Sequence, residues 1–145
     1  MSSIESTLAA DHRACDEHFA QAEAAAAAGD LPAARAHLAR FLAAMERHLR
    51  AEEALLFPAF EERTGMPGGP TSVMRHEHAQ MRELFGELQA TLEAGDAPAF
   101  LGATETLLFL MQQHNMKEEN MLYPMSDRAL GADAEALAER LRAYA

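Results

Sequence analysis

A histidine and a glutamate one helical turn apart occur twice in this chain, as His48 with Glu52 and as His114 with Glu118. Each pair is followed by a second glutamate and then by a leucine, an aromatic residue and a proline. Side chains four residues apart lie on the same face of a helix. Because imidazole nitrogen and carboxylate oxygen together suit iron or manganese, each pair is a candidate for half of a metal site.

The two pairs belong to a longer internal repeat. When the sequence is aligned with itself so that His12 falls on His78, the turn Gly-Asp-x-Pro at 29–32 falls on the same turn at 95–98. Over residues 12–58, 16 of 47 positions are identical to their counterparts. The sequence therefore predicts two related helical hairpins, about 12–58 and 78–124, with no gap in the alignment between them.

Apolar residues recur at intervals of three and four, which is typical of helices, and alternating strand patterns are absent. We expect helices over about 3–28, 31–63, 72–94 and 97–124, and a short fifth helix over 133–143. Pro58 should kink or end the second of these. Short turns between the helices predict an all-α, antiparallel up-down-up-down four-helix bundle, with residues 1–145 forming one domain.

The spacing from the turns places the four repeated histidines at one level. His12 lies almost as far before the glycine of the first turn as His48 lies after the aspartate of that turn. In antiparallel helices both would sit about 26 Å from the turn. His78 and His114 have the same relation to the second turn.

Two carboxylates in such a layer need a cation. Buried without a partner, they would cost several kcal/mol. Six ligands exceed a tetrahedral zinc site, and two carboxylates can bridge a metal pair. The sequence therefore predicts a binuclear iron centre, and the predicted ligands are His12, His48, Glu52, His78, His114 and Glu118.

At these residues, from Asp11-His12-Arg13 to Tyr123-Pro124, the chain resembles the hemerythrin family, in particular the bacterial hemerythrin-like HHE cation-binding domains. The resemblance implies a four-helix bundle with a non-haem di-iron centre. It also implies that Glu52 and Glu118 are bridging carboxylates beside an oxo or hydroxo group.

The chain departs from the oxygen-carrying hemerythrins at two places. Carriers have a fifth histidine, from a His-x3-His pair on the third helix, and the positions four away from His78 are Met74 and Arg82. We expect His76 to lie on the surface, and its alternative role is the missing imidazole. Carriers also place their second carboxylate five residues after the histidine, which would select Glu119. The repeat favours the glutamate four residues after it, and Glu53 and Glu119 are then solvated or supporting carboxylates.

Two further residues stand near the predicted ligands. Cys15 is one turn from His12, and Tyr123 replaces Phe57 in the repeat. Core packing is the preferred interpretation of both. The alternatives are a redox role beside the metals for the thiol and a hydrogen bond to a metal-bound oxygen for the phenol.

Composition excludes several classes of protein. A formal charge of −11 disfavours binding to phosphate backbones and to anionic membranes. The single cysteine excludes an internal disulfide framework. No apolar run is long enough to span a membrane, and the first residues do not resemble a leader, so we expect a cytoplasmic protein. A monomer or a weak homodimer is expected, and the sequence does not identify the redox partner.

The favoured function is binding rather than catalysis. We expect two iron ions that bind or sense dioxygen or a related diatomic such as nitric oxide, with the holding of iron as a further role. The alternative is a di-iron enzyme that acts on peroxide or supplies iron for iron-sulfur cluster repair. A metal-free interaction module is disfavoured by the paired carboxylates.

Overall fold

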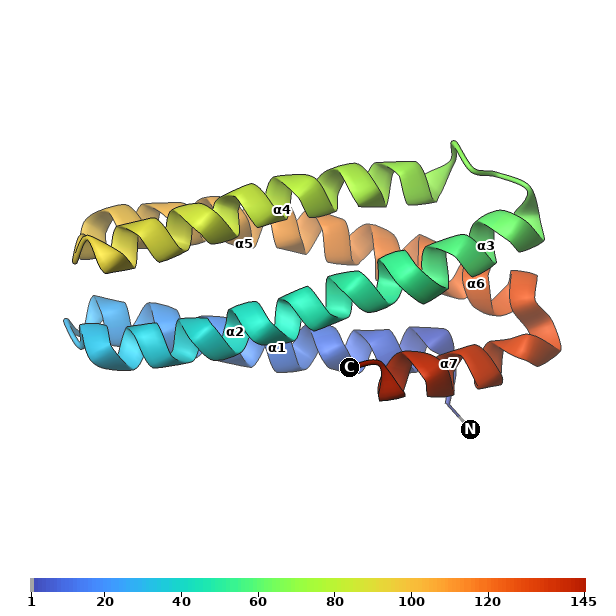
Figure 1. Cartoon of the computed structure of the whole chain (residues 1–145), viewed down its shortest axis with the longest axis horizontal. Coiled ribbons are helices and arrows are strands. Elements are labelled where there is room, and N and C mark those ends of the chain that lie inside the picture. Colours follow the sequence, from blue (N-terminus) through green and yellow to red (C-terminus); the bar gives the residue numbers. More distant parts are fainter. Residues whose placement is uncertain (1) are drawn as a thin grey trace.

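The computed structural model describes residues 2–145, and this part of the chain is helical and contains no strand. Four long rods run alternately up and down, which confirms the predicted all-α bundle (Figure 1). The rods begin as α1 (Ile4–Ala27), α2 (Leu31–Ala51), α4 (Pro70–Glu93) and α5 (Ala97–Lys117). The second of these helices continues through the π-helical turn η1 (Glu52–Leu56) into α3 (Phe57–Thr64), and the fourth continues through the π-helical turn η2 (Glu118–Leu122) into α6 (Tyr123–Leu130). A 3-10 turn, η3 (Gly131–Asp133), then leads into the last helix, α7 (Ala134–Ala143).

The two hairpin turns are built in the same way. Gly29 and Gly95 have φ angles of 79° and 69°, a left-handed conformation that a residue with a Cβ adopts only with strain. The next residues, Asp30 and Asp96, cap α2 and α5 by accepting hydrogen bonds from backbone N–H groups three residues ahead. A proline in the first turn of each helix also favours the start of the helix there, because its fixed φ angle suits this position.

Each hairpin contains one π-helical turn, and both lie just after the repeated histidines. These turns are η1 and η2, and the first and last residues of η2 are the repeat counterparts of those of η1. Pro58 does not end its rod: regular α-helix is interrupted in front of the proline by η1, and α3 then continues through Thr64. In the wider turn the N–H of Phe57 donates to the carbonyl of Glu52 five residues back. That register leaves room for a residue without an N–H.

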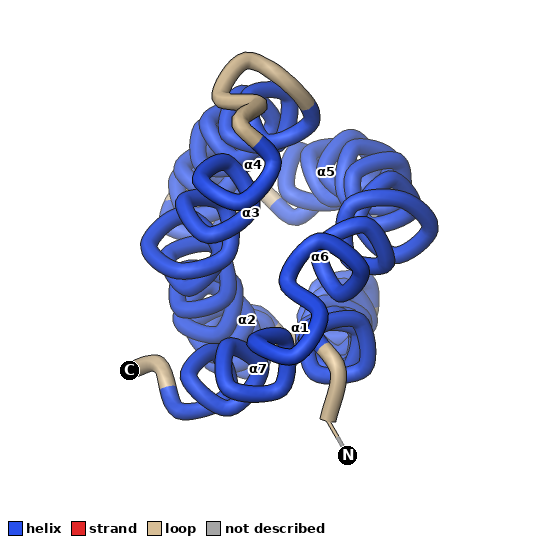
Figure 2. The backbone as a smooth tube through the Cα atoms, turned by 90° about the vertical axis from the view of Figure 1, so that its right-hand side faces the viewer, coloured by secondary structure: helices blue, strands red, loops and turns tan. Residues whose placement is uncertain are grey.

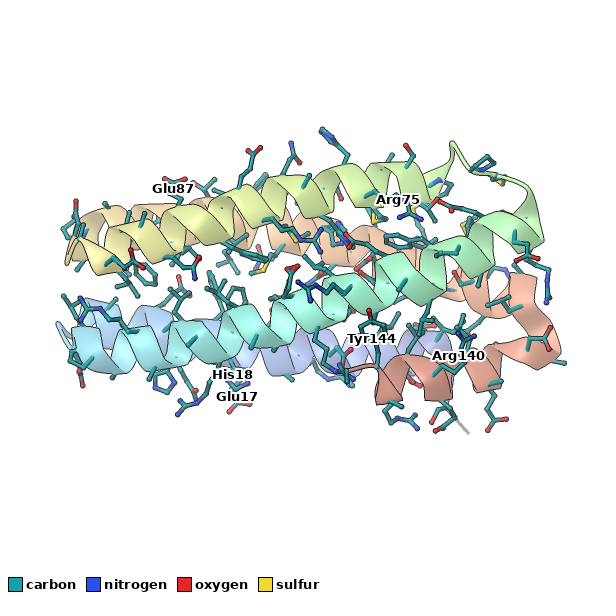
Figure 3. The ribbon with its side chains drawn as sticks, viewed as in Figure 1. Glu17, His18, Arg75, Glu87, Arg140 and Tyr144 are labelled. Atoms are coloured by element: carbon teal, nitrogen blue, oxygen red, sulfur yellow. The ribbon has the colours of Figure 1, made fainter. Side chains whose placement is uncertain are left out.

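Two apolar clusters fill the bundle. The first lies toward the hairpin turns and includes Phe19, Phe41 and Phe100. The second lies toward α3, α6 and α7 and includes Ile4, Leu8 and Phe60. Seen along the bundle, the four helices surround a common centre (Figure 2). Along each of them the repeated histidine falls between residues of the two clusters, so a polar layer separates the clusters. Charged side chains such as Glu17 and Glu87 point away from the bundle (Figure 3).

The last helix, α7, packs beside the start of α1 (Figure 1). Its buried face includes Leu137, Ala138 and Leu141. The guanidinium of Arg47 donates to the carbonyl oxygens of Tyr144 and Arg142, at 2.7 Å each, and so ties the end of α7 to α2. Within residues 2–145 no helix is long and apolar enough to cross a membrane.

Candidate metal centre

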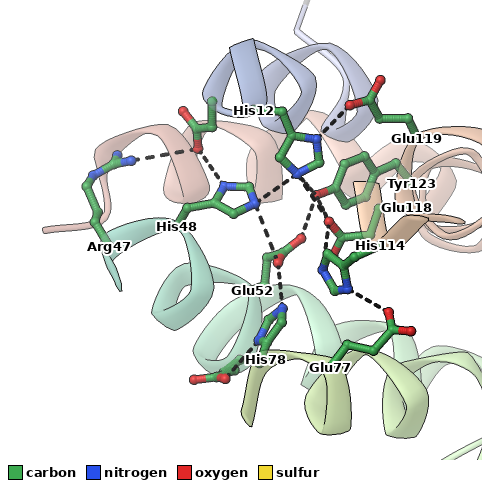
Figure 4. Close-up of polar contacts among 12 residues, drawn as sticks. His12, Arg47, His48, Glu52, Glu77, His78, His114, Glu118, Glu119 and Tyr123 are labelled. Carbon is green, nitrogen blue, oxygen red and sulfur yellow. Dashed lines mark hydrogen bonds and ion pairs between the residues drawn. The ribbon is translucent and has the colours of Figure 1, made fainter. Parts of the chain in front are cut away.

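The six predicted ligands lie together in the polar layer (Figure 4). All six are buried, with at most 3% of each residue exposed. They are His12 on α1, His48 on α2, Glu52 at the start of η1, His78 on α4, His114 on α5 and Glu118 at the start of η2.

Their donor atoms form two groups, in each of which the atoms lie within 4.8 Å of one another, and both groups contain Glu118. We name them the His12–His48 group (His12, His48 and Glu118) and the His78–His114 group (Glu52, His78, His114 and Glu118). Oε1 of Glu118 is 3.1 Å from Nε2 of His12 and 3.2 Å from Nε2 of His114. Oε1 of Glu52 is 3.2 Å from Nε2 of His78 and 3.5 Å from Nε2 of His48. Each carboxylate therefore lies between histidines of both hairpins.

The donor set fits a cation, because its polar atoms are not satisfied by the protein alone. In the described chain five buried side-chain nitrogen or oxygen atoms have no hydrogen-bond partner. Four of them belong to the predicted ligands: Oε1 of Glu52, Nε2 of His78, Nε2 of His114 and Oε2 of Glu118. An unsatisfied buried polar atom costs about 1–3 kcal/mol, and coordination to a metal ion would remove that cost.

A carboxylate accepts a hydrogen bond from the Nδ1–H of each histidine, which turns Nε2 toward the centre. His12 donates to Glu119 at 2.6 Å and His48 to Asp11 at 3.1 Å. His78 donates to Glu53 at 2.8 Å and His114 to Glu77 at 2.8 Å. Such contacts fix the tautomer and the ring orientation of metal-binding histidines and raise their basicity.

These four contacts obey the repeat. In the repeat alignment His12 corresponds to His78, and Glu53 corresponds to Glu119. The pair His12–Glu119 therefore corresponds to the pair His78–Glu53, and in both pairs the carboxylate belongs to the other hairpin. The pair His48–Asp11 likewise corresponds to the pair His114–Glu77. The supporting carboxylates are therefore duplicated together with the predicted ligands.

Cations neutralise three of the four supporting carboxylates. Glu53 accepts two hydrogen bonds from Arg82, at 2.7 and 3.0 Å, and Glu77 pairs with Lys117 at 2.5 Å. Asp11 lies 3.7 Å from Arg47. Glu119 pairs with no arginine or lysine in residues 2–145.

Near Glu119 the charge is reversed relative to the other half of the repeat. Its counterpart Glu53 is covered by Arg82, and the residue that the repeat matches with Arg82 is Asp16. Burial, together with repulsion from Glu119, raises the pKa of Asp16. Both carboxylates, with Glu23, line a cleft of about 690 Å³ between α1 and α5. On one side of the centre the supporting carboxylate is therefore covered by an ion pair, and on the other side it lines an acidic cleft.

The charges inside the layer depend strongly on one another. Burial alone lowers the pKa of His12, but the hydrogen bond and charge of Glu118 outweigh it and raise the pKa to about 9. Glu118 has the same effect on the pKa of His114, again to about 9. Burial would raise the pKa of Glu118, and the two histidines hold it well below its ordinary value. In the metal-free protein the raised pKa values favour the cationic form of both imidazoles at neutral pH, and a bound metal ion must displace the second proton of each.

Tyr123 breaks the symmetry of the layer. Its hydroxyl is completely buried, 2.6 Å from Oε2 of Glu52, 2.8 Å from Oε1 of Glu118 and 3.2 Å from Nε2 of His12. Its counterpart in the repeat is Phe57. The centroid of the Phe57 ring lies 5.4 Å from that of His78, and the centroid of the Tyr123 ring lies 5.7 Å from that of His12. The two aromatic rings are placed alike, and only one carries a hydroxyl.

Sequence reasoning missed part of this arrangement. Asp11 and Glu77 were not identified, although an acidic residue precedes His12 and its repeat partner in both hairpins. The hydroxyl of Tyr123 contacts the predicted ligands, whereas packing was the preferred interpretation. Cys15 is buried in the first apolar cluster, as its preferred interpretation predicted. His76 is exposed and belongs to neither donor group.

Comparisons with known proteins agree with this geometry. Residues 3–126 match the family described as "Hemerythrin HHE cation binding domain". The chain is 33% identical over 97 residues to the "Iron-sulfur cluster repair protein YtfE" of Edwardsiella ictaluri, an alignment that covers 60% of this chain. It spans about two fifths of that relative, or 42%. No solved structure matches the chain. With a match over most of its length and a buried cluster of histidines and glutamates in the matched region, the chain belongs to the hemerythrin HHE cation-binding family, which implies non-haem iron.

Proposed function

We propose that the chain binds two iron ions in one carboxylate-bridged centre and there binds or senses dioxygen or a related diatomic such as nitric oxide. The observation that carries this proposal is the division of the donor atoms into two groups that share Glu118. One ion cannot contact six donors divided in this way, whereas a carboxylate placed between two groups can serve two ions. The ligands we propose are His12, His48, Glu52, His78, His114 and Glu118.

Iron bound by imidazole and carboxylate supplies a change of oxidation state and coordination positions for small ligands. The protein supplies orientation and seclusion. The supporting carboxylates hold the four Nε2 atoms toward the centre, and the apolar clusters on both sides of the layer restrict access of water. None of the six predicted ligands lines the cleft beside Glu119, and all six are buried. A centre buried in this way suits a diatomic ligand better than an organic substrate.

Anaerobic loading with iron(II), followed by elemental analysis and visible spectroscopy, tests the proposal. We expect two iron ions per chain and a spectrum that changes on exposure to air or nitric oxide. Because no fifth histidine closes either position, we expect air oxidation to be reversed by a reductant and not by removal of oxygen. At most one iron per chain after loading would refute the binuclear centre.

The alternative function is that of a di-iron enzyme, which acts on peroxide or supplies iron to damaged iron-sulfur clusters. Its specific support is the similarity of the chain to the iron-sulfur cluster repair protein of Edwardsiella ictaluri. The loaded chain would then transfer iron to an apo-protein with free cysteine thiolates faster than it loses iron to buffer. Equal rates would leave ligand binding as the function.

A further inference from the structure

We propose that the two metal positions are unequal, with a retained ion in the His78–His114 group and an exchangeable ion in the His12–His48 group. The inference rests on the binuclear centre proposed above and assigns a separate role to each half of it. Tyr123 and Asp16 are the residues that create the difference, the first through affinity and the second through the rate of release.

The affinity difference follows from which polar atoms the protein already satisfies. In the His78–His114 group the Nε2 atoms of both histidines lack a hydrogen-bond partner. In the His12–His48 group Nε2 of His12 lies 3.1 Å from Nε2 of His48 and 3.2 Å from the hydroxyl of Tyr123. In the first group a metal ion therefore displaces no hydrogen bond of these two nitrogen atoms, whereas in the second group it must displace the existing contacts of His12.

Glu52 shows the same inequality within one carboxylate. Its Oε1, near His78, has no hydrogen-bond partner, whereas its Oε2 accepts a hydrogen bond from Tyr123 at 2.6 Å. A hydrogen bond to a charged acceptor contributes more than a neutral one. The phenol thus competes with an ion both for Oε2 of Glu52 and, through the same hydroxyl, for Nε2 of His12. We expect the two affinities to differ by about tenfold or more.

The rate difference follows from the outer surface. Beside His78 the supporting carboxylate is covered by Arg82, which closes that face with a two-point contact. Beside His12 the supporting carboxylate, Glu119, has 39% of its side chain exposed and shares the acidic cleft with Asp16. Negative charge along a cleft concentrates divalent cations and speeds their passage. The weaker position is therefore also the more accessible one.

Anaerobic titration of the metal-free protein with iron(II) tests the affinity difference. We expect two binding steps in the natural sequence and nearly equal steps in Tyr123→Phe. The double variant Phe57→Tyr with Tyr123→Phe moves the hydroxyl to the other half of the repeat, so the order of filling should reverse. Tyr144→Phe, which lacks contact with the ligands, is the matched control and should leave both steps unchanged.

Variants that keep only one of the two metal positions assign each binding step to its position. His114→Ala disables the retained position and should leave the weaker step, and His48→Ala should leave the tighter one. The double swap should exchange these two results. A purely structural role for Tyr123 would weaken both steps together, so unequal steps that persist in Tyr123→Phe, or an unreversed order in the swap, would overturn the inference.

Release of iron to an excess of an iron(II) chelator tests the role of the cleft. We expect one fast and one slow ion, and Asp16→Arg, an exposed substitution that copies the arrangement of Arg82, should slow the fast ion severalfold. An unchanged fast phase would overturn the role of Asp16. Two ions with equal affinities in the natural sequence would refute only the inequality, whereas binding of at most one ion would refute the binuclear centre itself.

Discussion

Replacing Glu77 tests whether the supporting carboxylates set the metal affinity. Glu77 accepts the Nδ1–H of His114 at 2.8 Å, and only 10% of its side chain is exposed. Loss of such a partner typically lowers metal affinity about 10- to 100-fold, and burial puts this residue at the upper end. We expect Glu77→Ala to weaken the tighter step about 100-fold, or about 2.7 kcal/mol. Glu77→Gln keeps an acceptor and loses only the charge, so we expect about tenfold, or about 1.4 kcal/mol.

The assay is anaerobic competition for iron(II) with a chelator of known affinity. Glu87→Ala is the matched control, because it removes the same charge from an exposed position on the outer side of the same helix (Figure 3). The helix content and the thermal midpoint should be compared for all three variants, so that unfolding is not mistaken for lost affinity. Equal affinities in Glu77→Ala and Glu87→Ala, with both folded, would refute the reasoning.

Three further results are expected. Glu118→Gln, which alters the carboxylate common to both donor groups, should reduce iron to at most one ion per chain by elemental analysis, and Glu119→Gln should retain two. His76→Ala should change neither the iron content nor the visible spectrum, because the residue is exposed. Burial, reinforced by Asp11 and Asp16, raises the pKa of Cys15 to about 12, so at pH 8 its thiolate fraction is about a thousandfold below that of an ordinary thiol. Alkylation by iodoacetamide, followed by mass spectrometry, should be slower by that factor in the native protein than in denaturant.

Much of the fold could be predicted because local signals agree with one another. Gly29 and Asp30 mark one turn by backbone conformation and capping, and their repeat partners mark the other. Once the turns are fixed, the rise per residue in a helix decides which side chains lie at the same level. The common level of the four histidines therefore follows from spacing, and the two glutamates follow their histidines by one helical turn.

Contacts between rods could not be predicted in the same way, because they depend on how each rod is rotated about its own axis. The π-helical turn after His48 changes the phase of all residues that follow it, and periodicity in the sequence does not reveal it. Glu119, which contacts His12, lies in the corresponding π-helical turn of the second hairpin, η2. The contacts of the Tyr123 hydroxyl with Glu52 and Glu118 could not be predicted for the same reason, because Tyr123 directly follows η2.

The exchange of carboxylates between the two hairpins has a mechanical consequence. His12 in the first hairpin is oriented by Glu119 of the second, and His78 in the second is oriented by Glu53 of the first. Each hairpin alone can therefore orient only one of its two histidines, His48 through Asp11 or His114 through Glu77. Ions bound by the proposed ligands would act as a crosslink between the two hairpins, and without them the same contact region contains unpaired polar atoms. Loss of metal would then loosen this contact region while each hairpin keeps its helices, so amide exchange would rise along α1 and α5 with little change in circular dichroism.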